Sequence, residues 1–217
     1  MATALVVSTI VVGLGGLVTA LLSAGITTDA TNFLAGDLSD SEFEEALVPL
    51  NSVQLLVTVA TLTTAVLTII WAYRIAKNVR AAGRSTTWSP LFAVFGWFLP
   101  PGVLYVIPFL VLRELWQASD PSTGNESDGW RRSGENPVLW VWFVLFGLLP
   151  AALLAVQIGS LATGGLPNTD LVAVAESLDD FGALGWVAAL GATGAAAAWV
   201  VFVRQLTSRH RQLTNEN

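Results

Sequence analysis

Residues 88–121 of the chain read WSPLFAVFGWFLPPGVLYVIPFLVLRELWQASDP. The first charged residue in this stretch is Arg113, so most of it is apolar enough to enter a lipid bilayer. Its middle is broken by Pro100 and Pro101, which remove two backbone donors and keep the residue before each one out of the helical conformation. The stretch therefore predicts a re-entrant helical hairpin over about residues 90–112, which enters the membrane and returns to the same side.

The composition places this hairpin in an all-α integral membrane protein. Hydrophobic residues make up 53% of the chain and charged residues only 12%, against roughly 25% charged in an average soluble domain. Four further stretches have the roughly 20 apolar residues that a helix needs to cross the hydrocarbon. The pieces between them are too short to bury a core of their own, so residues 1–217 are predicted to form a single membrane domain. The predicted spans are about residues 4–24, 53–73, 138–161 and 183–203.

The positions of lysine and arginine distinguish this four-helix topology from its alternative, five transmembrane helices. Short loops rich in these residues stay in the cytoplasm, and the loop between the first two spans is acidic, with no basic residue. If residues 90–112 cross the membrane, six of the ten basic residues fall outside, whereas if they return, all ten fall inside. The charges favour the hairpin, with both termini cytoplasmic. Seven tryptophans then lie near the cytoplasmic boundary, where indole rings favour the interface: Trp71, Trp88, Trp116, Trp130, Trp140, Trp142 and Trp199.

Several functions are disfavoured by the residues that are missing. The chain has no cysteine, and its net charge of −6 argues against a nucleic-acid partner. No Asp, Glu, Lys, Arg or His lies in the four long spans, where such residues usually mark catalysis or proton transfer. The one histidine, His210, is expected to be solvated in a cytoplasmic tail over residues 204–217. We therefore predict a protein that is not an enzyme, without cofactor or metal ion, since the acidic loop also lacks the order of a calcium-binding loop.

Charged residues gather where the predicted hairpin meets the cytoplasm. Arg113, Glu114 and Asp120 follow its returning arm, and Arg74 and Asn78 end the second span. We predict a polar cluster of these five side chains at the hairpin mouth, which either locks the hairpin to the bundle or docks something. The residues predicted to build the hairpin itself are Trp97, Pro100, Pro101 and Trp116.

A polar stripe follows one face of the second span. Gln54, Thr58, Thr61 and Thr68 have the spacing of one helical face, and Gln157 of the fourth span is a candidate to lie opposite. One interpretation is that these side chains bond to other helices or to their own backbone. The alternative is that they line a path, which makes the chain a small-solute channel or transporter with the hairpin in its path.

Three motifs occur in a fixed order around the hairpin. They are WAYRIAKNVR at 71–80, SPLFAVFGWFLP at 89–100 and RELWQASDP at 113–121, and the tail adds FVRQLTSRHRQL at 202–213. In this ordered set the chain resembles the prokaryotic membrane family described as domain of unknown function 4328, over roughly residues 50–210. The resemblance implies a multi-span plasma-membrane protein of a prokaryote and brings no established activity. Members often carry an asparagine soon after the hairpin proline, where this chain has Val103 and Leu104.

Together these patterns favour a non-enzymatic scaffold or accessory subunit that binds a partner at its cytoplasmic face. The expected partners are another membrane protein or further copies of the chain. Arg131 and Arg132, beside Trp130, are placed to meet anionic lipid headgroups.

Single cysteines in this cysteine-free chain test the predicted topology. Cysteines replacing Ser41 and Ser177 are expected to react with a membrane-impermeant maleimide in intact cells. Those replacing Ser127 and Ser208 should react only after the membrane is opened, because both are predicted to be cytoplasmic. Labelling of Ser127 and Ser208 from outside, without Ser177, would show that residues 90–112 cross the membrane.

Overall fold

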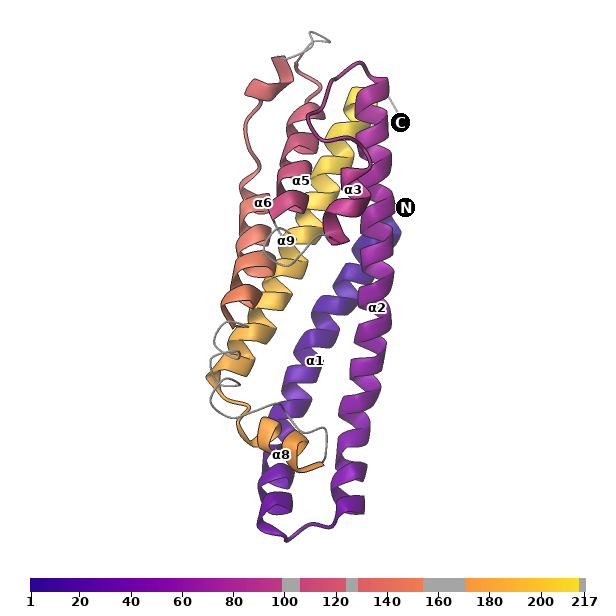
Figure 1. Cartoon of the computed structure of the whole chain (residues 1–217). Coiled ribbons are helices and arrows are strands. Elements are labelled where there is room, and N and C mark those ends of the chain that lie inside the picture. Colours follow the sequence, from indigo (N-terminus) through magenta and orange to yellow (C-terminus); the bar gives the residue numbers. More distant parts are fainter. Residues whose placement is uncertain (99–105, 124–128, 154–170, 215–217) are drawn as a thin grey trace.

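The computed structural model describes residues 1–98, 106–123, 129–153 and 171–214, and within them the chain is all-α, as predicted. The helices form one elongated bundle with three long members (Figure 1). In chain order the elements are α1 (Ala2–Ala35), α2 (Asp40–Ala81), α3 (Phe92–Phe95), η1 (Gly96–Phe98), α5 (Val106–Ala118), η2 (Gly129–Arg132), α6 (Pro137–Trp142), η3 (Phe143–Leu148), α8 (Leu171–Asp179) and α9 (Ala183–Thr214).

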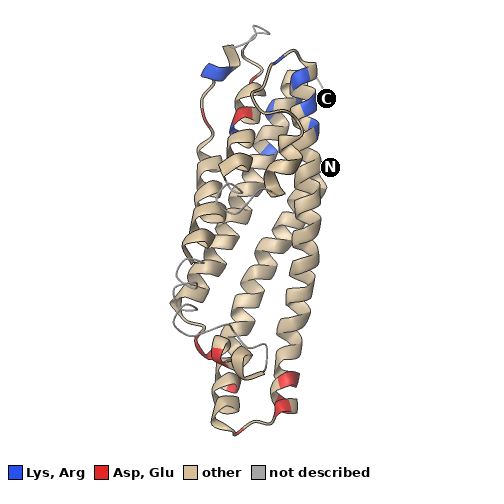
Figure 2. Cartoon of the chain, viewed as in Figure 1, with Lys and Arg blue, Asp and Glu red and all other residues tan. Residues whose placement is uncertain are grey.

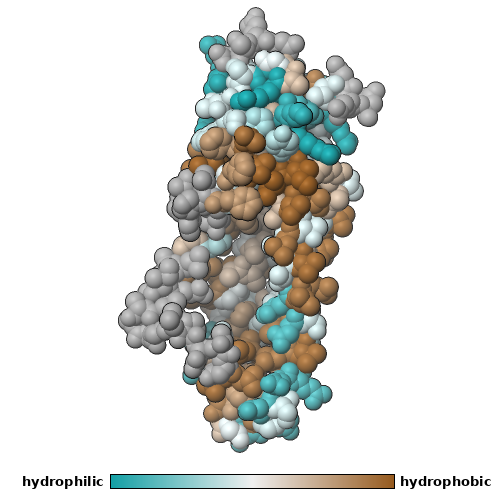
Figure 3. Space-filling model, turned by 45° about the vertical axis from the view of Figure 1, so that its right-hand side comes forward, coloured by the Kyte–Doolittle hydropathy of each residue, from teal (hydrophilic) through white to brown (hydrophobic). Residues whose placement is uncertain are grey.

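Three of these helices, α1, α2 and α9, are long and apolar enough to cross a membrane. They span 34, 42 and 32 residues, and even the shortest is about 48 Å long at 1.5 Å per residue, against about 30 Å of hydrocarbon. Apolar side chains cover the middle of the bundle and hydrophilic ones gather at its two ends (Figure 3). Many large apolar side chains there are exposed, Leu14 and Leu56 among them. This pattern is typical of a protein that is surrounded by lipid around its middle and by water at its two ends.

The charges divide between the two ends of the bundle. Lysine and arginine gather at one end, whereas only Asp and Glu colour the other (Figure 2). We call the first the basic end. It is formed by the last turns of α2, α5 and α9 with the loops beside them (Figure 1).

Both the basic end and the acidic end have an apolar core. Toward the basic end, Trp199 of α9 packs against Trp71 of α2 and Trp142 of α6, with ring centroids 5.9 and 4.9 Å away. Near the acidic end, α8 joins a second cluster with α1 and α2, in which Phe33 stacks on Phe43 at 4.5 Å. Burial of each such ring removes 150–250 Å² of surface from solvent, so these contacts dominate the packing.

The tryptophans differ from the prediction in what they touch. Trp71, Trp130, Trp142 and Trp199, which were expected at the membrane interface, are all buried in the core cluster of the basic half of the bundle. Their rings fill the space between helices because the neighbouring positions on α9 are small. These indole rings therefore belong to the packed core between the helices rather than to the membrane–water interface.

Helix boundaries follow local signals that extend the helices past the predicted spans. α1 continues to Ala35, where Gly36 adopts a left-handed conformation with φ of 84°. α2 starts at a capping box. The Glu42 side chain accepts a hydrogen bond from the Ser39 backbone N–H, and the Ser39 side chain accepts one from the Glu42 backbone N–H. The apolar stretches of the sequence predicted only the membrane-crossing parts of these helices. Their remaining turns pack on each other in the second apolar cluster, near the acidic end.

The last helix corrects the expectation of a solvated tail. α9 continues through residues 204–214, and His210 is only 5% exposed, with its Nδ1 3.4 Å from the Ser119 hydroxyl. Leu206, one turn earlier, is fully buried. The last turns of α9 contact the end of α5 through His210 and Arg209, a partner that the sequence did not reveal.

The hairpin region and the fourth span are described in part. Of the predicted hairpin, the structure describes α3 and η1 over Phe92–Phe98 and α5 from Val106, and α5 ends at Ala118 as the Ser-Asp-Pro sequence predicts. In the fourth span α6 passes into the wide π-helical turns of η3 directly before Pro150, whose ring would crowd the preceding turn of a regular helix. Pro100, Pro101 and Gln157 lie outside the described residues.

Small residues let the long helices approach closely. A Cβ added at Gly13 of α1 would lie 3.0 Å from the Cβ of Ala196 on α9, and one at Gly194 would lie 3.0 Å from Leu145. By contrast, a Cβ at Gly16, one turn from Gly13, meets nothing within 4 Å. Close contact of helix backbones through small residues is the usual mode of packing in membranes.

We expect Gly13→Val to lower the free energy of unfolding by about 1–3 kcal/mol, the usual range for overpacking a tight contact. Ala196 has no flexible atoms that can move away, so the two helices must separate. Thermal unfolding in detergent, followed by tryptophan fluorescence, measures the effect. Gly16→Val is the matched control and should leave the midpoint nearly unchanged, while equal effects of both variants would contradict the packing role of Gly13.

Candidate functional site

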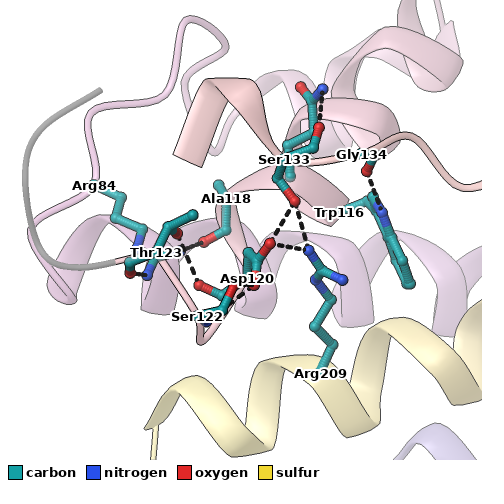
Figure 4. A network of polar contacts seen from close by, with 10 residues as sticks. Arg84, Trp116, Ala118, Asp120, Ser122, Thr123, Ser133, Gly134 and Arg209 are labelled. Carbon is teal, nitrogen blue, oxygen red and sulfur yellow. Dashed lines mark hydrogen bonds and ion pairs between the residues drawn. The ribbon is translucent and has the colours of Figure 1, made fainter. Parts of the chain in front are cut away.

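The charged residues singled out from the sequence lie at the basic end, where four segments meet. These are the loop after α2, the C-terminal end of α5, the loop before α6 and the last turns of α9 (Figure 1). Polar contacts between these segments form a connected network, part of which is drawn in Figure 4. Its main anchors are Arg84, Glu114 and Asp120.

Arg84 holds the loop after α2 against the end of α5. Gly83, in a left-handed conformation with φ of 82°, ends the preceding helix and turns the chain toward α5. Arg84 is 1% exposed and donates hydrogen bonds to the carbonyls of Ala118, at 2.7 Å, and Thr123, at 2.8 Å (Figure 4). Ala118 is the last residue of α5, so its carbonyl has no partner within the helix and the guanidinium satisfies it, while Thr123 lies in the loop that follows. Burial lowers the pKa of Arg84, and the nearby Asp120 carboxylate opposes that shift.

Glu114 fixes the other side of the same loop. Its two carboxylate oxygens accept hydrogen bonds from the backbone N–H groups of Thr87, at 2.7 Å, and Trp88, at 3.0 Å. The side chain is 9% exposed, so these are its partners in place of water. Glu114 therefore anchors the start of the predicted hairpin to its returning arm. This role is one of the two alternatives left open by the sequence.

Asp120 links the end of α5 to α9 and to the loop before α6. Its oxygens accept hydrogen bonds from the backbone and hydroxyl of Ser122 and from the Ser133 hydroxyl at 2.5 Å (Figure 4). Arg209 forms an ion pair with Asp120 at 2.6 Å and donates a hydrogen bond to the Ser133 hydroxyl oxygen, also at 2.6 Å. Burial raises the pKa of Asp120, but the hydrogen bonds from Ser133 and Ser122 and the charge of Arg209 outweigh it, so the pKa lies below its ordinary value of 3.8. The stabilisation from this carboxylate is therefore present at neutral pH and is lost only as the pH falls through the lowered pKa.

Two further contacts tie the loop before α6 to α5. Arg113 forms an ion pair with Glu135, and the Trp140 indole donates to the same carboxylate at 2.8 Å. The hydrogen bond from Trp140, together with the charge and hydrogen bond of Arg113, lowers the pKa of Glu135 and outweighs the opposing effect of burial. The Trp116 indole donates to the Gly134 carbonyl at 3.0 Å (Figure 4). Because Arg113 and Glu135 are both more than one third exposed, their pair adds little stability.

The five side chains of the predicted cluster are thus at one end of the bundle but do not contact one another. Arg113, Glu114 and Asp120 each bond to a different segment. Arg74 is exposed and Asn78 half-buried, and within the described part of the chain neither side chain forms a hydrogen bond or ion pair. Helical periodicity predicts which face of a helix carries each of these residues. It does not predict the path of the loops that supply their bonding partners.

The hairpin residue Trp97 packs its ring on Trp142 at 6.4 Å, in an edge-on arrangement. It is half-buried, so it joins the tryptophan core of the basic half. The returning arm lies close behind it, since a Cβ on Gly96 would come within 3.0 Å of Ile107.

Four functional side chains of this network were missed by the sequence analysis. Arg84 and Arg209 were counted only as topological charges, and Ser133 and Glu135 were not considered. One signal was available for Arg84, which follows Gly83 at a helix end and precedes an apolar stretch. No local pattern marks Ser133 or Arg209, because their pairing with Asp120 depends on the path of the loop before α6 and on the position of α9.

The polar stripe on α2 does not face the inside of the bundle. Gln54, Thr58 and Thr61 are exposed, and the two threonine hydroxyls donate to carbonyls of their own helix at 2.8 and 2.7 Å. Thr68 alone of the four is buried. This arrangement agrees with the interpretation in which the hydroxyls bond to their own backbone.

The class of protein follows from this geometry. Apolar helices of membrane-crossing length carry polar loops at their basic end, and within the described residues no group of three His, Asp or Glu side chains is placed to hold a metal ion. The chain is a helical protein of the membrane-spanning type.

The family is shown by comparison with known proteins. The family described as Domain of unknown function (DUF4328) matches residues 35–208, so the chain belongs to it and the resemblance seen in its motifs is confirmed. No curated protein and no solved structure matches the chain.

Replacing Arg84 tests whether the buried guanidinium holds the basic end together. We expect Arg84→Met to lower the free energy of unfolding by about 2 kcal/mol or more, because two buried hydrogen bonds to a charged donor are lost and two carbonyls are left without partners. Arg132→Met is the control, since Arg132 is exposed and contacts no described side chain. Equal unfolding midpoints for Arg84→Met and the wild type would remove Arg84 from this role.

Proposed function

We propose that the chain is a non-enzymatic membrane scaffold or accessory subunit that binds an acidic protein partner through its basic end. One observation carries the proposal: the loops of the basic end are fixed by buried polar contacts, while seven of its cations remain exposed to solvent. The cations that remain exposed are Arg74, Lys77, Arg80, Arg131, Arg132, Arg204 and Arg211.

The rigidity of these loops favours binding. Arg84 and Glu114 both hold the loop after α2, and Asp120 holds the loop before α6, through buried or half-buried contacts. A surface that is already ordered loses less conformational entropy when a partner binds. A simple membrane anchor needs no such network, whereas a docking platform gains affinity from it.

The charge of the surface indicates the chemistry of the partner. Exposed arginine and lysine side chains on one face attract an acidic surface and speed its association. A protein at the cytoplasmic side of the same membrane, or a membrane protein with an acidic loop there, fits this requirement. Another copy of the chain presents cations at the same end and would be repelled in a side-by-side arrangement.

The topology that belongs to this proposal has four spanning helices around a re-entrant hairpin, with both termini in the cytoplasm of a prokaryote. It is supported by α3 and α5, which flank residues 99–105 and lie next to each other in the basic half of the bundle (Figure 1). The close approach of Gly96 to Ile107 is what the two arms of a hairpin require. The exposed position of Thr58 and Thr61 gives the channel alternative no comparable support.

Site-specific crosslinking in native membranes tests the partner proposal. A single cysteine at Arg132, carrying a short photoreactive group, is expected to form a protein adduct whose yield falls at high salt, because exposed charges are screened. The same group on a cysteine at Ser41, near the acidic end, is the control and should give no such adduct. Absence of a salt-sensitive adduct at Arg132, or the same adduct from Ser41, would contradict the proposal.

The contribution of the ordered loops is tested separately. Glu114→Ala removes the acceptor for two backbone N–H groups without changing any exposed cation. The adduct yield at position 132 should fall severalfold in this variant if loop order matters. An unchanged yield would show that charge alone recruits the partner.

A further inference from the structure

An open groove of about 520 Å³ lies at the basic end between α9 and the end of α5. One wall is the α9 face that carries Arg204, Gln205 and Ser208, and the other includes Trp116 and Asp120. We infer that this groove binds a phosphate group, and that the group belongs to the headgroup of an anionic phospholipid.

Asp120 is the one carboxylate among the described residues that line the groove, and both of its oxygens already have partners. One oxygen accepts hydrogen bonds from the N–H and the hydroxyl of Ser122. The other accepts a hydrogen bond from Ser133 and forms an ion pair with Arg209. The groove therefore has little to offer a cation or a hydrogen-bond donor.

Donors, by contrast, remain available on the α9 wall. Arg204 is exposed, and neither its guanidinium nor the Ser208 hydroxyl bonds to any side chain in the described part of the chain. Ser208 follows Arg204 by four residues, so the two side chains lie on the same helical face. A guanidinium and a hydroxyl side by side are suited to an oxyanion.

The orientation of Gln205 adds a further donor. The Asn136 side-chain oxygen caps α6 by accepting from Val138 N–H at 2.8 Å, so the Asn136 amide nitrogen is the donor toward Gln205. That nitrogen bonds to Oε1 of Gln205 at 2.7 Å, which leaves the Nε2 group of Gln205 free to donate. The cap on α6 thus makes the Gln205 side chain a donor within the groove.

The position of the groove along α9 indicates where the phosphate comes from. Arg204 is the first charged residue after the uncharged stretch 183–203, so it lies where the apolar part of the helix ends. Phospholipid phosphates lie at this level of a bilayer, and a basic side chain there is worth about 1 kcal/mol. The Trp116 ring, held under Arg209 at 4.5 Å, adds an apolar surface for the glycerol part of a lipid.

The test uses the full chain purified in detergent. Native mass spectrometry counts phosphatidylglycerol and phosphatidylcholine retained at equal lipid concentrations, and we expect clear preference for phosphatidylglycerol. Arg204→Gln should weaken phosphatidylglycerol binding about fivefold, the equivalent of about 1 kcal/mol. Arg74→Gln is the matched control, because Arg74 is an exposed arginine at the same end but outside the groove. Its binding should stay within twofold of the wild type.

Equal retention of the two lipids by the wild type, or equal weakening by the two variants, would overturn the inference. A second arm adds sodium phosphate, or sodium chloride at the same ionic strength, and follows thermal unfolding. Stabilisation by phosphate that requires Arg204, without lipid preference, supports the phosphate site but assigns it to a soluble phosphate ester. The inference does not depend on a protein partner, since crosslinking and lipid retention are separate measurements.

Discussion

The arrangement of the basic end depends on the bond between Arg84 and the end of α5. A helix end leaves carbonyl groups without partners in the helix. The buried guanidinium of Arg84, from a different part of the chain, bonds to the carbonyl of Ala118, the last residue of α5, and to that of Thr123 in the loop that follows. The loop after α2 is thereby fixed to α5, and Glu114 of α5 holds the same loop a few residues later.

The carboxylates of the basic end are structural for the same reason. Glu114 accepts hydrogen bonds from two backbone N–H groups, and Asp120 accepts three hydrogen bonds and pairs with Arg209, so both negative charges are compensated within the protein. The electrostatic potential at the surface of this end is therefore set mainly by its exposed arginines and lysines. An acidic protein partner and an anionic headgroup are favoured by the same positive charge.

Packing in the long helices divides the bundle into two regions. In the basic half, tryptophans from α2, α6 and α9 meet around Trp199, and the small residues of α9 leave room for them. In the other half α1 and α2 are long paired helices whose outward faces are apolar, with α8 closing their ends. The basic half is tightly packed and can support an ordered binding surface at its end. The other half mainly exposes apolar side chains to lipid.

From the sequence alone one could predict the all-α class, the position of the apolar helices, the family and the end at which the cations gather. These properties depend on composition and on periodicity along one helix, which do not require knowledge of neighbours. The sequence did not reveal that α9 continues through His210, that Arg84 is buried, or that Asp120 pairs with Arg209 and Ser133. Those contacts join residues up to about ninety positions apart, and only the packing of α5 against α9 brings them within reach. Tertiary structure also decided that Thr58 and Thr61 face outward, because a polar stripe defines a helix face but not what that face meets.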